Sequence, residues 1–193
     1  MIVLGVDQAR RSGWAIHNGQ SIVASGFVQD TSGMMGVIAM VQAFADGSPY
    51  LAVFEDHACI PLSSKAKFAR GQVPRRNTAT ILGMGASLGR WEVALDLSQH
   101  PERLRLAVEP NDWRGRVLGL LPSASTDRCK AAAMEYASRL IARPVTDHNE
   151  AEAICLACWG SLDGVAILNA ERRHKRMRER IVRQQLKQRG LPW

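Results

Sequence analysis

Residues 1–28 carry the hydrophobic pattern of three successive strands. The first run, MIVLGVD, is contiguous, apolar and rich in β-branched residues, which predicts a buried strand. The segment GWAIHNGQSIVASGFV predicts two more strands around Asn18-Gly19, a dipeptide typical of tight hairpin turns. We therefore expect the chain to open with three antiparallel strands.

Helical and strand-like patterns alternate along the rest of the chain. A helical period covers 32–45, a short apolar strand that ends in acids covers 50–56, and a helix starts at Asn77 and runs to 97. The pattern then predicts a fifth strand over 103–110 and a helix over 125–142 with its N-cap at Ser125 or Thr126. A last helix is predicted over 144–160.

The order of these elements indicates a fold class. It runs as three antiparallel strands, helix, strand, helix, strand, helix and helix, with a long loop over 57–76 where no period is clear. This is the order of a ribonuclease H-like domain. We predict an α/β fold built on a mixed five-stranded sheet, with the three antiparallel strands first and helices on both faces.

The last predicted helix combines an apolar body with a cluster of acids. In its sequence, PVTDHNEAEAICLACWG, the residues Asp147, Glu150 and Glu152 crowd negative charge beside a segment apolar enough to be buried. Asp147 and Glu150 fit a capping box, and acids early in a helix also complement its dipole. The alternative is a site where a cation offsets the repulsion between carboxylates.

Two more acids end predicted strands. Asp7 ends the first strand and Glu55 the fourth, and sheets of this kind place their ligands at strand ends. If these two acids converge with two acids of the last helix, the four carboxylates would need cations, and their hard oxygen atoms suit Mg²⁺, with Mn²⁺ as a substitute. Two such ions about 4 Å apart can activate a water and stabilise the leaving oxygen of a phosphodiester.

The positive charge of the chain is concentrated in two stretches. The formal net charge is +7, and residues 171–193 alone contain nine Lys or Arg and two Glu, so the other 16 basic and 16 acidic residues cancel. Between His57 and Trp91 there is no acid, and six basic residues occur there: Lys65, Lys67, Arg70, Arg75, Arg76 and Arg90. Two basic stretches on a neutral body indicate a polyanion as partner.

The cysteine content and the hydropathy pattern indicate where in the cell the protein is located. Four cysteines in 193 residues are too few and too scattered for a disulfide framework, and we interpret Cys155 and Cys158 as thiols of the core. We expect no apolar run long enough to span a membrane, and the N-terminus carries charges where a signal peptide is apolar. We therefore expect no membrane partner and a location in the cytoplasm of a bacterial or phage-infected host cell.

The chain resembles a known family, the RuvC-type Holliday-junction resolvases, and in particular their phage-like branch. The resemblance covers residues 1 to about 160 and is carried, in order, by LGVDQARRSGWAI, AVFED, GMGASLGRW, VEPNDWRGRVLG, KAAAMEYASRL and DHNEAEAICLA. It implies a Mg²⁺-dependent endonuclease that acts as a homodimer, nicks two strands of a four-way DNA junction and leaves 5′-phosphate ends. We accordingly divide the chain into a nuclease domain, 1–168, and a basic C-terminal helix or tail, 169–193.

The resemblance also implies a set of metal ligands. Asp7, Glu55 and Glu152 match three acids of the family by position. Relatives usually have an acid or a histidine three residues before the last acid, but this chain has Asn149 there. We assign the fourth position to Asp147, with His148 and Glu150 as alternatives, and expect Glu150 to cap the helix if Asp147 is a ligand.

Basic residues carry the expected contacts to DNA. Lys130 opens a helix where the resemblance implies a lysine near the scissile phosphate, and Arg114 follows Trp113 in a segment that presents a basic residue in relatives. We interpret Trp113 itself as a core residue. The remaining expected DNA contacts are in the loop: Lys65, Lys67, Arg70, Arg75 and Arg76.

The chain departs from the family at two further places. Gln8-Ala9 replaces the usual Pro-Gly after the first aspartate, and EDHACIP lacks the aromatic residue that relatives insert into the junction. We expect the metal site to survive the first change and junction opening to differ because of the second. Dimerisation is implied by the resemblance, and Gly83, Gly85 and Gly89 would let two helices approach closely.

Other functions remain as alternatives. The YqgF-like nucleases share the fold and act on RNA, and a nuclease for a wider range of branched DNA would share the site. A sugar-kinase or actin-like phosphate-binding module would need a glycine turn after its first strand, and DQARRSG is poorly built for one. The number of acids argues against a junction-binding protein with a dead active site.

Overall fold

A mixed five-stranded sheet forms the centre of the protein. The computed structural model describes residues 1–56, 78–101 and 104–170. The strands are β1 (Val3–Asp7), β2 (Ser12–His17), β3 (Ile22–Val28), β4 (Leu51–Glu55) and β5 (Arg105–Val108), in the order β3-β2-β1-β4-β5. The first three are antiparallel neighbours, and β4 and β5 continue the sheet in parallel with β1. The predicted meander and mixed sheet are confirmed.

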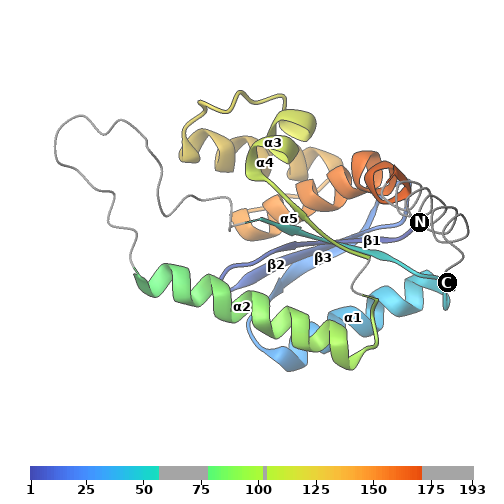
Figure 1. Cartoon of the computed structure of the whole chain (residues 1–193). Helices are drawn as coiled ribbons and strands as arrows, with labels where there is room; N and C mark the ends of the chain where they lie inside the picture. Colours follow the sequence, from blue (N-terminus) through green and yellow to red (C-terminus); the bar gives the residue numbers. More distant parts are fainter. Residues whose placement is uncertain (57–77, 102–103, 171–193) are drawn as a thin grey trace, which may run out of the picture.

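Helices cover both faces of the sheet, as predicted (Figure 1). On one face lie α1 (Thr31–Ala45) and α2 (Thr78–Leu97), and on the other lie α3 (Pro110–Leu118), α4 (Thr126–Leu140) and α5 (His148–Trp159). Each face has its own apolar core. The first is built around Leu4, Val6, Ile16, Met34, Ile38 and Trp91, and the second around Val3, Val53, Leu104, Trp113, Ile154 and Leu156.

Local signals fix where several helices begin. Asp30 caps α1 by accepting a hydrogen bond from the backbone N–H of Gly33. Ser125, one of the two predicted caps, accepts from the N–H of Arg128 at the start of α4.

The short helix α3 was not predicted from the sequence. Pro110 stands at its first turn and Gly119 ends it with a φ of 65°, so both terminal signals are present. Among its described residues, only Trp113 is buried, so its nine residues show no apolar stripe. Trp113 is fully buried, which confirms its interpretation as a core residue.

The helix α5 lies directly on the sheet. A Cβ atom at Gly5 would collide with the backbone of Ala153 and Ala157, and one at Gly13 with the backbone of Asn149. Both strands therefore need glycine where α5 crosses them. This close approach brings the first turns of α5 down to the strand ends where Asp7 and Glu55 lie.

The helical path continues past α5 through a π-helical turn, Gly160–Gly164, and the structure describes it as far as Ala170. Contrary to the expectation from the sequence, His148–Ala170 is long and apolar enough to cross a membrane by length and composition alone. However, 67% of its apolar window is buried inside the fold, as in the core helix of a globular domain. Cys155 and Cys158 are among its buried residues, which confirms that they belong to the core. The expected domain boundary at 168 stays a prediction.

Candidate metal centre

Three carboxylates meet at one end of the sheet. β1 and β4 are parallel neighbours with Val6 in register with Phe54, so the next residues, Asp7 and Glu55, end the two strands side by side. α5 adds Glu152 from above the sheet. One oxygen from each of the three side chains lies within 4.8 Å of the others. We call Asp7, Glu55 and Glu152 the acid cluster.

Burial makes this cluster electrostatically costly. The three residues are only 5–7% exposed. Desolvation by burial, followed by the charges of Glu152, Glu55 and Asp147, raises the pKa of Asp7 well above its usual value. Burial and the charge of Glu152 raise the pKa of Glu55 to about 7. A cation bound among these groups would remove much of the cost, because it favours the ionised forms.

The donor set fits a hard divalent cation. Mg²⁺ and Mn²⁺ prefer carboxylate oxygens, and the cluster offers three such groups at close range. Neither thiolate nor imidazole belongs to this group of three. The cluster therefore fits Mg²⁺ or Mn²⁺ better than a softer metal such as zinc.

A positive side chain already borders the acid cluster. Arg114, on α3, places Nη2 3.4 Å from Oε1 of Glu55 and 4.0 Å from Oε1 of Glu152. Its guanidinium carbon lies 5.0 Å from the centre of the Trp113 ring, which helps to hold it in place. Arg114 lowers the pKa of Glu55 and Glu152, but burial dominates and both values remain raised.

Asp147 lies beside the acid cluster but is not one of its three members. Its Oδ1 accepts hydrogen bonds from the N–H groups of Asn149, at 2.8 Å, and Glu150, at 3.3 Å, so Asp147 is the N-cap of α5. Its Oδ2 lies 3.5 Å from Nε of Arg11. Its charge nevertheless helps to raise the pKa of Asp7, and its role as the fourth ligand stays a prediction.

The alternatives for the fourth position occupy different surroundings. His148 precedes Glu152 by one helical turn, and its charge lowers the pKa of that carboxyl against the larger effect of burial. Asn149 donates from Nδ2 to the backbone carbonyl of Arg11 at 2.9 Å. His148 is therefore the alternative with an electrostatic link to the cluster.

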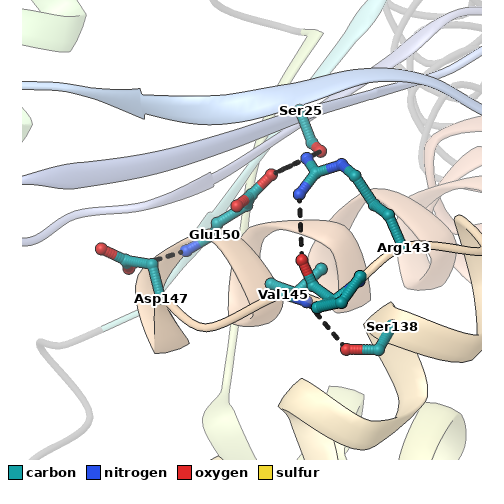
Figure 2. Close-up of polar contacts among 7 residues, drawn as sticks. Ser25, Ser138, Arg143, Val145, Asp147 and Glu150 are labelled. Atoms are coloured by element: carbon teal, nitrogen blue, oxygen red, sulfur yellow. Dashed lines mark hydrogen bonds and ion pairs between the residues drawn. The ribbon is translucent and has the colours of Figure 1, made fainter.

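Glu150 belongs to a different network, shown in Figure 2. Its Oε1 accepts a 2.7 Å hydrogen bond from Oγ of Ser25 on β3 and is paired with the guanidinium of Arg143. Arg143 also donates to Oγ of Ser25 at 3.1 Å. The expectation that Glu150 caps the helix is wrong, because Asp147 makes the cap and Glu150 anchors α5 to the edge strand.

The basic residues expected to bind DNA are only partly within the described structure. Lys130 lies on α4, and its charge lowers the pKa of Glu152, which brings it into the electrostatic range of the cluster. Arg114 contacts the cluster itself, as described above. The five loop residues lie outside the described residues: Lys65, Lys67, Arg70, Arg75 and Arg76.

The sequence did not single out Arg11 as part of the site. Its guanidinium lies 3.2 Å from the centre of the Phe27 ring, and its Nε approaches Asp147. The feature of the sequence that could have identified it is the pair of arginines, Arg10 and Arg11, which follows Asp7 closely. Their position in the turn between the first two strands places them at the same sheet end as the acids.

Comparisons with known proteins give matches in structure alone. No protein-family model matches the chain, and no curated protein matches its sequence. The chain is similar to the structure of Thermus thermophilus RuvC in complex with a Holliday junction substrate, with a TM-score of 0.54 and 14% identity over 81% of this chain and 90% of that one. A second Thermus thermophilus RuvC structure gives a TM-score of 0.52 and 14% identity over 81% and 91%. The chain therefore has the RuvC-type, ribonuclease H-like fold.

Proposed function

We propose that this protein is a metal-dependent endonuclease that resolves four-way DNA junctions by paired phosphodiester hydrolysis and leaves 5′-phosphate ends. The observation that carries the proposal is the acid cluster, in which three buried carboxylates, two at strand ends and one on α5, lie close together in a RuvC-type fold. One similar structure is a RuvC bound to a Holliday junction substrate. That likeness supports DNA as the substrate class here.

Each side chain of the site has a role in this proposal. Asp7, Glu55 and Glu152 would hold Mg²⁺, with Asp147 as the proposed fourth ligand. When bound, the metal supplies Lewis-acid stabilisation of the scissile phosphate and a water of lowered pKa. Lys130 and Arg114 are the cations that would contact phosphate oxygens. Arg114 is suited to this because its planar guanidinium, now beside Glu55, can bind phosphate as well as carboxylate.

We further propose that the protein acts as a homodimer in the cytoplasm, since paired nicks need two active sites. The exposed side of α2 supports this, because no atom of another described element lies within 4 Å of a Cβ built at Gly83, Gly85 or Gly89. Val93 and Leu97 are 52% and 67% exposed on the same helix. Together they offer a surface of small and apolar residues on which a second copy could pack.

Cleavage of an immobile four-way junction tests the proposed reaction. The junction, a linear duplex of the same sequence and a structured RNA are incubated separately with the protein in Mg²⁺ or in EDTA. We expect Mg²⁺-dependent cleavage of the junction at paired positions and little cleavage of the duplex, with Asp7→Asn as the inactive control. Faster cleavage of RNA would favour the YqgF-like alternative, and equal cleavage of flaps and forks would favour a broader branched-DNA nuclease.

The basic tail is proposed as a second DNA contact. Residues 171–193 lie outside the described structure, but they carry the whole net charge of the chain. Contacts between basic residues and phosphates release counterions and make affinity depend steeply on salt. Deletion of 171–193 should therefore weaken junction binding and flatten the slope of log affinity against log salt concentration. An unchanged slope would show that the tail does not contact DNA.

A further inference from the structure

An exposed aromatic residue lies in the same row of the sheet as the acid cluster. Asp7 of β1 is in register with Gly13 of β2, and Gly13 is in register with Phe27 of β3. Residues directly opposite each other in antiparallel strands share one face, so Asp7 and Phe27 lie on the same face, two strands or about 10 Å apart. The first turn of α5 passes over Gly13 between them.

Phe27 is about half exposed to solvent. It is 46% exposed on the edge strand β3, although its face of the sheet otherwise packs against α5. Arg11 covers the ring, with its guanidinium carbon 3.2 Å from the ring centre. A guanidinium group therefore lies over an aromatic ring at the edge of the proposed active site.

The position of Arg11 is fixed at two points. Its Nε lies 3.5 Å from Oδ2 of Asp147, and its backbone carbonyl accepts a hydrogen bond from Nδ2 of Asn149. Its side chain is nevertheless 42% exposed. The ion pair with Asp147 and the contact with Phe27 favour this position of the guanidinium in the absence of ligand, which lowers the entropy lost when a ligand binds.

Internal stability alone explains this arrangement poorly. A cation–π contact at an exposed site contributes only about 0.5–1 kcal/mol. Keeping a phenylalanine about half exposed forfeits part of the hydrophobic gain that a buried position would give. A surface that combines an exposed ring with an ordered arginine is instead typical of sites that stack nucleobases.

We propose that Arg11 and Phe27 form a stacking platform for an unpaired nucleobase of the DNA strand whose phosphate lies at the acid cluster. The proposal rests on the function proposed above. Bases inside a duplex already stack on both faces, so the ligand is a base freed at a branch point. The guanidinium edge can also contact a phosphate of the same strand.

A thermodynamic cycle that combines substitution of Phe27 with removal of a DNA base tests the platform. Dissociation constants are measured in the Asp7→Asn background, which prevents cleavage, for junctions that carry a single abasic site at each crossover position in turn. Where the platform holds a base, its removal should weaken binding about 5-fold to 100-fold. Removal of that base should hardly change binding by Phe27→Leu. Its effect should be reduced in Arg11→Lys, which keeps the positive charge but lacks the planar guanidinium.

Phe44→Leu is the matched control. Phe44 is also 46% exposed, but it lies on α1, on the opposite face of the sheet. Phe44→Leu should therefore respond to every abasic site as the parent does. The platform is rejected if the effects of Phe27→Leu and of base removal are additive at all crossover positions.

The same cycle on a single-stranded oligonucleotide separates this proposal from the reaction. Coupling between ring and base on that DNA, in a protein that fails to cleave junctions, would uphold the platform and reject the proposed resolvase activity. Additive effects on both DNAs, in a protein that does cleave junctions, would reject the platform and leave the reaction standing.

Discussion

Glu150 and Glu152 are two residues apart on α5 and equally hidden from solvent, at 6% and 7% exposure. Glu150 faces Ser25 and Arg143, which donate to it and neutralise its charge. Glu152 faces two further carboxylates, and the charges of Arg114, His148 and Lys130 do not outweigh the effect of its burial. The same residue type therefore has opposite surroundings on two sides of one helix.

This difference shows which property separates a candidate metal ligand from a structural carboxylate here. Burial alone does not distinguish the two residues, whereas the balance of charge does. Burial raises the pKa of Glu152, and oxygens of two further carboxylates lie within 4.8 Å of one of its own. A site that is unfavourable without a cation is one that is prepared to bind a cation.

The largest expected difference is in catalysis. Asp7→Asn or Glu55→Gln should reduce junction cleavage by more than about 100-fold, because even the loss of a group that merely supports a metal ligand costs about 10–100-fold. Junction binding, measured in parallel by gel shift, should persist because the basic residues remain. A variant with near-normal turnover in Mg²⁺ would remove that residue from the proposed mechanism.

The two glutamates should also differ in the sign of their effect on stability. In metal-free buffer at pH 8, Glu152→Gln removes a repelling charge and should raise the midpoint of thermal unfolding. Glu150→Gln weakens the contacts with Ser25 and Arg143 and should lower the free energy of unfolding by roughly 1–2 kcal/mol, a modest loss because Arg143 is half exposed. Shifts of the same sign in both variants would contradict the comparison.

The stability of the metal-free protein should fall as pH rises. Glu55 has a pKa of about 7 in the folded state, against an ordinary value of 4.5. Between these values the unfolded state binds fewer protons than the folded state, so the free energy of unfolding falls with pH and levels off above about pH 7. Urea unfolding at several pH values should show this decline, and Glu55→Gln should flatten it. If the free energy of unfolding declines equally with pH in the variant, groups other than Glu55 cause the decline.

Arg114 should produce the smallest effect. Arg114→Gln removes the guanidinium beside Glu55 and should destabilise the metal-free protein by about 1 kcal/mol, since the pair is partly exposed. Bound Mg²⁺ would take over this neutralising role, so the loss should shrink in Mg²⁺. Thermal unfolding in EDTA and in Mg²⁺ compares the two conditions, and an equal loss in both would show that Arg114 acts through packing on Trp113.

Sequence patterns predicted the parts of the protein that local rules determine. Asp7 and Glu55 were identifiable because each ends an apolar strand, and strand ends of parallel neighbours meet at one edge. The helix α3 escaped prediction because its only buried residue is Trp113, which leaves no period to detect. Its Arg114 was therefore expected on DNA and not against Glu55.

Long-range partners were beyond the reach of sequence patterns. Glu150 was expected to cap its helix, but its partner Ser25 is 125 residues away on β3, and no local pattern reports such a contact. The stacking of Arg11 on Phe27 likewise depends on the register of β2 and β3. Pairing between distant segments is decided by tertiary packing, which the sequence alone did not reveal.

Titration of the metal-free protein with Mn²⁺, followed by calorimetry, tests the central claim most directly. The account predicts that the parent and Glu150→Gln bind Mn²⁺ with similar affinity, because Glu150 is turned toward Ser25 and Arg143. It predicts that Glu152→Gln, two residues further along the same helix, loses at least tenfold in affinity. Equal Mn²⁺ binding by Glu152→Gln and the parent would contradict the assignment of the acid cluster as the metal centre.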